Sequence, residues 1–131
     1  AKVTAMPQGS ADLGTVLVAG GAGWVGSVLV DALGLRAAEL GVARVVVADV
    51  RARHQRPGGA GIAIEEISLD VSDPEAVEAA FLRTRPDTVL NLAAVIDVRP
   101  EADSVRMEAV NAVGTGTLLD AATRHGARGF V

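Results

Sequence analysis

The chain has 131 residues and a formal net charge of −4, and half of its residues are hydrophobic with very few aromatic side chains among them. This length suits one domain with a real core, and the acidic balance argues against nucleic acid as the main partner. The absence of cysteine excludes a disulfide framework, a thiolate nucleophile and a cysteine metal site, and it suits a reducing cytoplasm. Because no apolar run is long enough to span a membrane, we expect a cytoplasmic protein without a membrane partner.

The first ordered element is expected to follow a short lead-in. Residues 1–14 lack a signal-peptide core and predict a flexible segment, so the domain is expected to span 15–131. The apolar run 15–19 predicts a buried strand. Apolar residues at helical spacing then continue from Val25 to Leu40, and Gly41 fits a C-terminal cap. A glycine-rich turn therefore connects a strand directly to a helix.

That turn reads Gly-Gly-Ala-Gly-Trp-Val-Gly over residues 20–26. Gly20 would let the chain turn sharply, Gly23 would let a pyrophosphate approach the backbone, and Gly26 would let the helix pack closely on the sheet. The amides of residues 22–25, at the positive end of the helix, would face the phosphates. The alternative is a tight strand-to-helix turn that binds no ligand.

An acidic residue ends the second predicted strand, residues 44–49. Asp49 follows Gly26 at about the 20-residue spacing expected of the carboxylate that holds a ribose diol. An ordinary turn residue is the alternative, but together with the glycine turn Asp49 favours a dinucleotide. Its charge would repel a 2′-phosphate, which favours NAD. The arginines of the following loop, predicted over 50–61, leave NADP as the second choice.

The rest of the chain alternates between strands and helices. Ser72 or Asp73 is expected to cap a helix that begins at Pro74 and ends before the break at 85–87. Further strands are predicted over 62–67, 88–93 and 130–131, a loop over 94–103 and a long helix over 105–125. This alternation predicts an α/β fold, a Rossmann-like doubly wound parallel sheet with strand order 3-2-1-4-5.

Five motifs carry a family resemblance over most of the chain. They read Ala-Gly-Gly-Ala-Gly-Trp-Val-Gly-Ser at 19–27, Leu-Asp-Val-Ser-Asp at 69–73, Pro-Asp-Thr-Val-Leu-Asn-Leu-Ala-Ala at 86–94, Asn-Ala-Val-Gly-Thr at 111–115 and Gly-Phe-Val at 129–131. In this order they resemble motifs of the extended short-chain dehydrogenase/reductases, the NAD-dependent epimerase/dehydratase family. Ala19 and Asn91 stand where the family usually has Thr and His.

The resemblance implies roles for individual residues. Asp70 and Val71 would meet the adenine, residues 92–94 would lie beside the nicotinamide ribose, and Asn111 would support the active site. There is a simpler interpretation of each polar residue. Asp70 could be only a turn or cap residue, and Asn111 could only bind buried backbone groups. With no metal ligands expected, the predicted cofactor-binding residues are Gly20, Gly23, Trp24, Val25, Gly26, Asp49, Asp70, Val71, Leu92, Ala93, Ala94 and Asn111.

The family's Tyr-x-x-x-Lys pair, in which the tyrosine acts as general acid and base, has no counterpart here. The chain contains no tyrosine, and Lys2 is its only lysine. We therefore expect that the chain holds no catalytic residue. It is expected to be the cofactor-binding part of an enzyme, truncated at the fifth strand and inactive alone. The parent is expected to be a homodimer that transfers a hydride between NAD(P) and a small polar substrate such as a nucleotide sugar. The alternative is a non-catalytic regulatory module that senses a dinucleotide.

Overall fold

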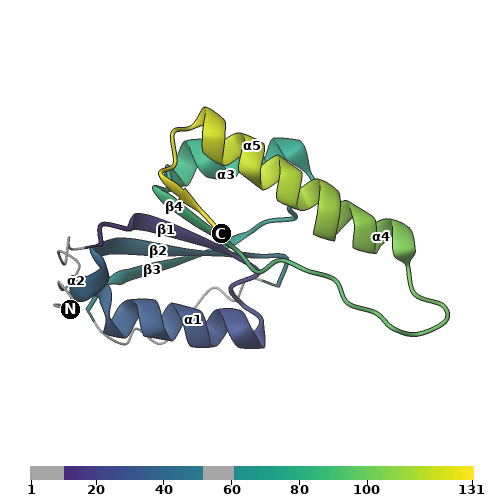
Figure 1. Ribbon diagram of the computed structural model, residues 1–131, viewed down its shortest axis with the longest axis horizontal. Coiled ribbons are helices and arrows are strands. Elements are labelled where there is room, and N and C mark those ends of the chain that lie inside the picture. Colours follow the sequence, from purple (N-terminus) through teal and green to yellow (C-terminus); the bar gives the residue numbers. More distant parts are fainter. Residues whose placement is uncertain (1–10, 52–60) are drawn as a thin grey trace, which may run out of the picture.

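Five parallel strands form the centre of the protein in the computed structural model, which describes residues 11–51 and 61–131 (Figure 1). The strand order β3-β2-β1-β4-β5 confirms the predicted doubly wound sheet. Most of the predicted lead-in and loop, residues 1–10 and 52–60, lies outside the described residues. The strands are β1 (Gly14–Ala19), β2 (Val42–Asp49), β3 (Ala63–Ser68), β4 (Thr88–Asn91) and β5 (Gly129–Phe130).

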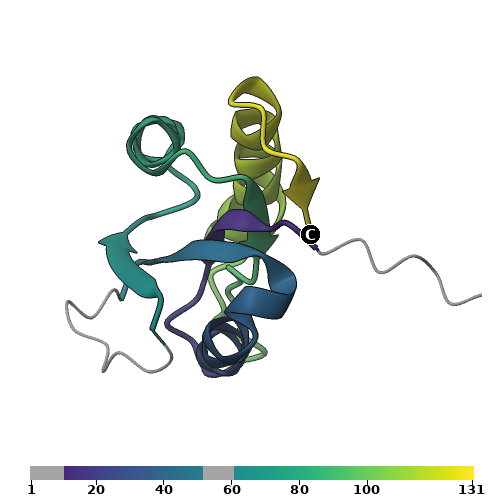
Figure 2. The ribbon, with the colours of Figure 1, turned by 90° about the vertical axis from the view of Figure 1, so that its left-hand side faces the viewer.

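Helices cover both faces of the sheet, as Figures 1 and 2 show. Along β1, Val16 and Val18 belong to the core on the α1 side, whereas Leu17 and Ala19 belong to the core on the α3 and α5 side. All four side chains are fully buried, as expected for a parallel strand covered on both faces. The helices are α1 (Trp24–Leu35) and α2 (Ala37–Leu40) on one face, and α3 (Pro74–Thr84), α4 (Ser104–Glu108), η1 (Ala109–Gly114) and α5 (Thr115–Arg124) along the other.

The helix predicted to run to Leu40 is broken near its end. Helix α1 stops at Leu35, and Arg36 leaves helical geometry with φ −108° and ψ 19° before α2 begins. Gly34 lies in the last turn of α1, where its weak helix propensity lowers the free-energy cost of a break. The short α2 then ends, as predicted, at Gly41 in the left-handed conformation, with φ 61°.

Strand β2 begins at Val42 rather than at residue 44, β3 and β5 are shifted by one residue, and two larger differences concern β4 and the long helix. Strand β4 ends at Asn91 rather than at residue 93, because its neighbour β1 turns away after Ala19, the partner of Asn91 in the register. The long helix around residues 105–125 contains the six-residue π-helical segment η1 between α4 and α5. Within residues 11–51 and 61–131, no helix has the length and apolar character needed to cross a membrane.

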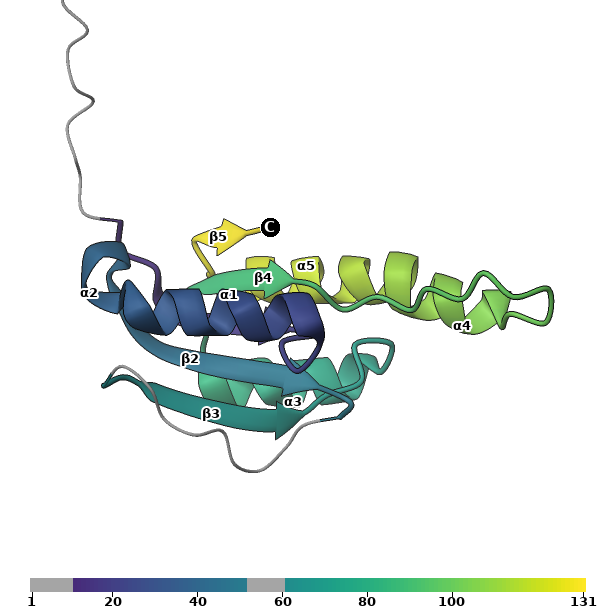
Figure 3. The same cartoon turned by 90° about the horizontal axis from the view of Figure 1, so that it is seen from below.

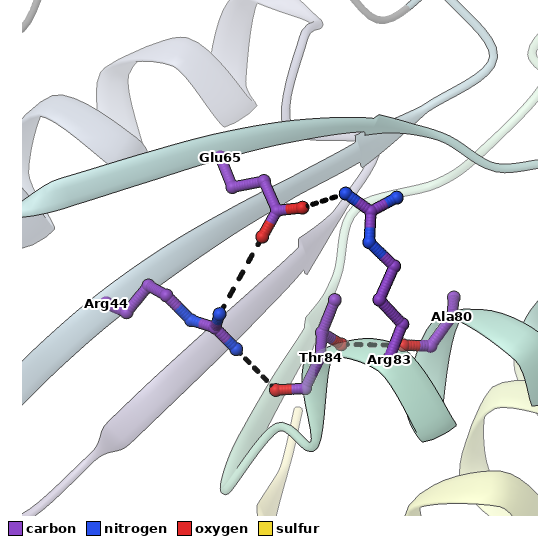
Figure 4. A network of polar contacts seen from close by, with 5 residues as sticks. All are labelled: Arg44, Glu65, Ala80, Arg83 and Thr84. Atoms are coloured by element: carbon purple, nitrogen blue, oxygen red, sulfur yellow. Dashed lines mark hydrogen bonds and ion pairs between the residues drawn. The ribbon is translucent and has the colours of Figure 1, made fainter.

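Helix α3 is fixed at both ends by polar contacts. Asp73 caps its N-terminus by accepting hydrogen bonds from two first-turn amides at 3.1 and 3.3 Å, as predicted. At its C-terminus, Arg44 of β2 donates to the carbonyl oxygen of Thr84 at 2.5 Å, which also suits the negative end of the helix. Glu65 of β3 contacts the guanidinium groups of both Arg44 and Arg83 (Figure 4). The contacts at its C-terminus hold α3 against strands β2 and β3.

Helices α3 and α5 are joined by a cluster around Glu78, which leads to a pH prediction. Its carboxylate accepts hydrogen bonds from His125 Nε2 at 2.8 Å and Arg124 Nη1 at 2.7 Å. These bonds, that of His125 first, lower the pKa of Glu78 below its ordinary value of 4.5. A lowered folded-state pKa contributes stability that is present above the ordinary pKa and lost as the pH falls through the lowered value.

We therefore expect Glu78→Gln to lower the Tm slightly at neutral pH and to have no effect at a pH below the lowered pKa. Thermal melts of both chains across this range would measure the difference. The exposed Glu108 provides the control Glu108→Gln. A difference in Tm that stayed constant as the pH fell would contradict the assignment.

Candidate dinucleotide site

A cleft of about 600 Å³ opens at the edge of the sheet where the parallel strands end. This is the edge at which ligands bind in open α/β sheets, beside the point where the strand order reverses, here between β1 and β4. The cleft is lined by Gly20, Gly23, Ala48, Asp49, Val50, Arg51, Asp70, Val71, Leu92, Ala93, Ala94, Val95, Ile96, Arg106 and Val110.

The glycine turn is built from close backbone contacts. Gly20 has φ 75°, a conformation that other residues rarely adopt, and a Cβ on it would lie 2.6 Å from the backbone nitrogen of Ala93. A Cβ on Gly26 would lie 2.5 Å from the carbonyl oxygen of Gly20 and 2.6 Å from the Cα of Gly21. The first turn of α1 therefore lies directly against the turn that precedes it. Gly20 lines the cleft, whereas Gly26 is buried beneath it.

Helix α1 begins at the cleft without a side-chain cap. Its N-cap is Gly23, which makes no side-chain hydrogen bond, and a Cβ on Gly23 would meet only the carbonyl oxygen of Gly20, at 3.4 Å. The N-terminus of a helix offers free amides and a positive dipole end to an anion. Trp24 and Val25 are 85% and 59% exposed and do not line the cleft, so only their backbone could serve a phosphate.

Asp49 reaches the glycine turn from the end of β2. Its Oδ2 accepts a hydrogen bond from the amide of Ala22 at 3.2 Å, and its Oδ1 accepts one from the amide of Arg51 at 3.0 Å. Ala22 is one of the residues whose amides were expected to face phosphates, and the structure uses it to hold the carboxylate. The contact places a negative acceptor directly beside the turn, where a ribose diol would need it.

Asp70 lies on the wall that follows β3. Its Oδ1 accepts hydrogen bonds from the hydroxyl of Ser72 at 2.6 Å and the amide of Ser72 at 2.9 Å. These bonds lower the pKa of the Asp70 carboxyl, and the guanidinium of Arg106 adds to the effect. The carboxylate is therefore ionised at neutral pH. Asp70 thus has the turn role considered from the sequence and also lines the cleft beside Val71.

The opposite wall is the segment 92–95, held in place by two asparagines. Asn91 Oδ1 accepts from the amide of Ala93 at 3.1 Å, and Asn91 Nδ2 donates to the hydroxyl of Thr115 at 3.0 Å. Asn111 bonds both the amide and the carbonyl of Val95 at 2.8 Å. After this wall the chain runs past the ends of the strands before it returns as α4 (Figures 1 and 3).

The structure brings most of the predicted residues to one cleft. Trp24, Val25, Gly26 and Asn111 do not line it. Asn111 supports its wall by bonding the backbone of Val95, but these groups are not buried as its simpler interpretation expected. Sequence reasoning missed Arg106, although it lies four residues before Val110, an apolar helix position that also lines the cleft. Residues four apart share a helix face, which is the signal that could have found it.

The doubly wound sheet, the glycine turn and the cleft at the switch point define a Rossmann-type nucleotide-binding domain. The sequence profile of the NAD dependent epimerase/dehydratase family matches residues 16–131. The chain belongs to this family, and the predicted resemblance and the prediction of NAD as the family's cofactor are confirmed.

Several known proteins resemble the chain, and all are much longer. A dTDP-L-rhamnose 4-epimerase of Burkholderia thailandensis is 31% identical over 85% of this chain and 31% of its own length. The structure of a Thermus thermophilus UDP-glucose 4-epimerase with NAD has a TM-score of 0.68 and 35% identity, covering 88% of this chain and 36% of that one. Bordetella bronchiseptica WbmG with NAD has a TM-score of 0.70 and 29% identity over 96% and 38%. The chain thus spans about a third of the length of these relatives.

Proposed function

We propose that this chain binds NAD in the cleft at the ends of the strands. The pyrophosphate would lie at Gly20, Gly23 and the N-terminus of α1, and Asp49 would hold the diol of the adenosine ribose. The adenine would lie between the Asp70–Val71 turn and the segment 92–95, whose residues 92–94 would also reach the nicotinamide ribose as the resemblance implies. The fit of the cradle supports this, because the backbone at Gly23 is open to an approaching group where a side chain would intrude.

The observation that carries the proposal is the hydrogen bond between Asp49 Oδ2 and the amide of Ala22, at 3.2 Å. It joins the end of β2 to the glycine turn, so an acceptor for a sugar diol and an anion-binding helix end stand side by side. The arrangement is the one that a dinucleotide requires.

For the parent enzyme we infer hydride transfer on a nucleotide sugar, with NAD accepting or returning the hydride. Support comes from the relatives, which include a UDP-glucose 4-epimerase and a nucleoside-diphosphate-sugar epimerase of Agrobacterium tumefaciens that is 26% identical. Residues of this chain would bind and orient the cofactor. Proton transfer by a Tyr-x-x-x-Lys pair would come from elsewhere, because these 131 residues hold no tyrosine.

Two further proposals concern what surrounds this chain. The second candidate function is a regulatory module that senses NAD without converting a substrate, and the lack of tyrosine favours it. It would be supported if the native full-length protein bound NAD but had no enzymatic activity. We also infer a homodimeric parent, because Val105 on α4 and Val113 on η1 are 77% and 55% exposed. Sedimentation of the parent as a monomer would contradict this.

The substitution Asp49→Asn tests the cofactor site. The amide oxygen can still accept a hydrogen bond, but the charge that binds the diol and repels a 2′-phosphate is gone. We expect NAD affinity to fall roughly tenfold and the preference for NAD over NADP to shrink, as measured by titration calorimetry with each cofactor. Asp120→Asn, on the exposed side of α5, is the control. Unchanged affinities, or no binding of NAD by the wild type, would refute the proposal.

A further inference from the structure

The π-helical segment η1 contacts both walls of the cleft. On one side Gly114 is buried against Val71, and a Cβ on Gly114 would lie 2.7 Å from Val71 Cγ2. On the other side Asn111 bonds both backbone groups of Val95 at 2.8 Å. Val110, only 8% exposed, lies on the same segment and lines the cleft itself. One segment therefore touches two walls that come from distant parts of the chain.

The π-helical geometry explains how residues 111 and 114 reach different walls. In an α-helix, positions three apart lie on the same face. A π-helix closes its hydrogen bonds between residues five apart, so each turn contains more residues. A step of three residues then falls further short of a full turn, and positions three apart point in more different directions than they do in an α-helix. The side chain of Asn111 and the Cα of Gly114 can then contact opposite walls.

We propose that η1 sets the width of the cleft between Val71 and the segment 92–95, with Gly114 as the positioning residue. This rests on the proposed function, since the width matters only to a ligand that lies between these walls. Gly114 does not line the cleft, so it acts through Val71. A side chain at residue 114 must displace Val71, or move η1 together with the wall that Asn111 holds, and either change alters the distance between the walls.

The substitution Gly114→Ala tests the proposal. Gly114 has φ −60° and ψ −40°, so alanine fits the backbone and any loss comes from the contact with Val71. We expect affinity for NAD to fall roughly tenfold, as overpacking between two fixed elements costs about that much. Calorimetry with AMP should show the same factor, because the adenine is the part placed between the walls. Gly116→Ala is the matched control, since nothing lies within 4 Å of its Cβ, and it should bind NAD as the wild type does.

A rescue experiment separates positioning from a general loss of structure. Val71→Ala removes the methyl group that a Cβ at residue 114 would meet. We expect the double variant Gly114→Ala/Val71→Ala to bind NAD about as well as Val71→Ala alone, even if Gly114→Ala alone folds poorly. Wild-type affinity in Gly114→Ala, or a double variant with no recovery, would overturn the proposal. A wild-type chain that bound neither NAD nor AMP would instead refute the proposed function.

Discussion

A Gly26→Ala chain is expected to lose about 3 kcal/mol or more of its free energy of unfolding and all measurable NAD binding. Alanine is intrinsically better than glycine within a helix by up to about 1 kcal/mol, so the loss must come from the surroundings. The new Cβ would meet backbone atoms of Gly20 and Gly21 at 2.5 to 2.8 Å. Backbone cannot move aside as a side-chain end can, so α1 would have to shift away from the turn. Chemical denaturation would measure the loss of stability, and titration calorimetry on the folded chain would measure the loss of NAD binding.

The neighbouring substitution Gly23→Ala provides the control, because it should separate folding from binding. Its Cβ would meet only the carbonyl oxygen of Gly20, at 3.4 Å, so stability should change by less than about 1 kcal/mol. Gly23 lines the cleft, however, and a methyl group there would stand where a phosphate has to approach. We expect a folded chain with weakened NAD binding. Equal losses of stability in Gly23→Ala and Gly26→Ala would show that the two glycines do not have these different roles.

The fold could be predicted from the sequence because its signals are local. The runs 15–19 and 44–49 are apolar throughout most of their length, and strands buried on both faces read this way. Asp49 stands at the end of such a run. Because parallel strands end at one edge of the sheet, this position alone predicts that Asp49 lies at the same edge as the glycine turn. Once strands and helices alternate, right-handed crossovers leave few strand orders to consider.

What could not be predicted depends on contacts between distant segments. The π-helical segment lies within a helical pattern that looks continuous, and the residues it contacts, Val71 and Val95, are not connected to residues 109–114 by any periodicity. The early end of β4 is likewise set by the turn after Ala19 on a neighbouring strand. Local propensity predicts neither feature, because both depend on tertiary contacts.

Asp87 shows the same limit, since it belongs to the same motif, residues 86–94, as the residues 92–94 that are expected beside the cofactor. In the structure the motif is divided between the two ends of β4. Asp87 precedes the strand, at the edge opposite the cleft, where its Oδ2 accepts a hydrogen bond from the amide of Thr15 at 2.9 Å. Its backbone amide donates to the carbonyl of Thr15 at 2.8 Å, and its carbonyl accepts from the amide of Arg128 at 2.7 Å. One residue thus aligns the starts of β1, β4 and β5.

The substitution Asp87→Ala is therefore expected to destabilise the fold by about 1–3 kcal/mol, because the amide of Thr15 loses its partner in a half-buried place. The exposed ion pair with Arg128, at 3.8 Å, should contribute little. Asp87→Asn separates the two contributions, since its amide oxygen can still accept from Thr15 while the charge is gone, and it should keep most of the stability. Denaturant unfolding of the three chains measures this. In the folded state Asp87→Ala should bind NAD with wild-type affinity, because the cleft lies at the other end of the strands. A selective loss of NAD affinity without a loss of stability would instead place Asp87 in the cofactor site.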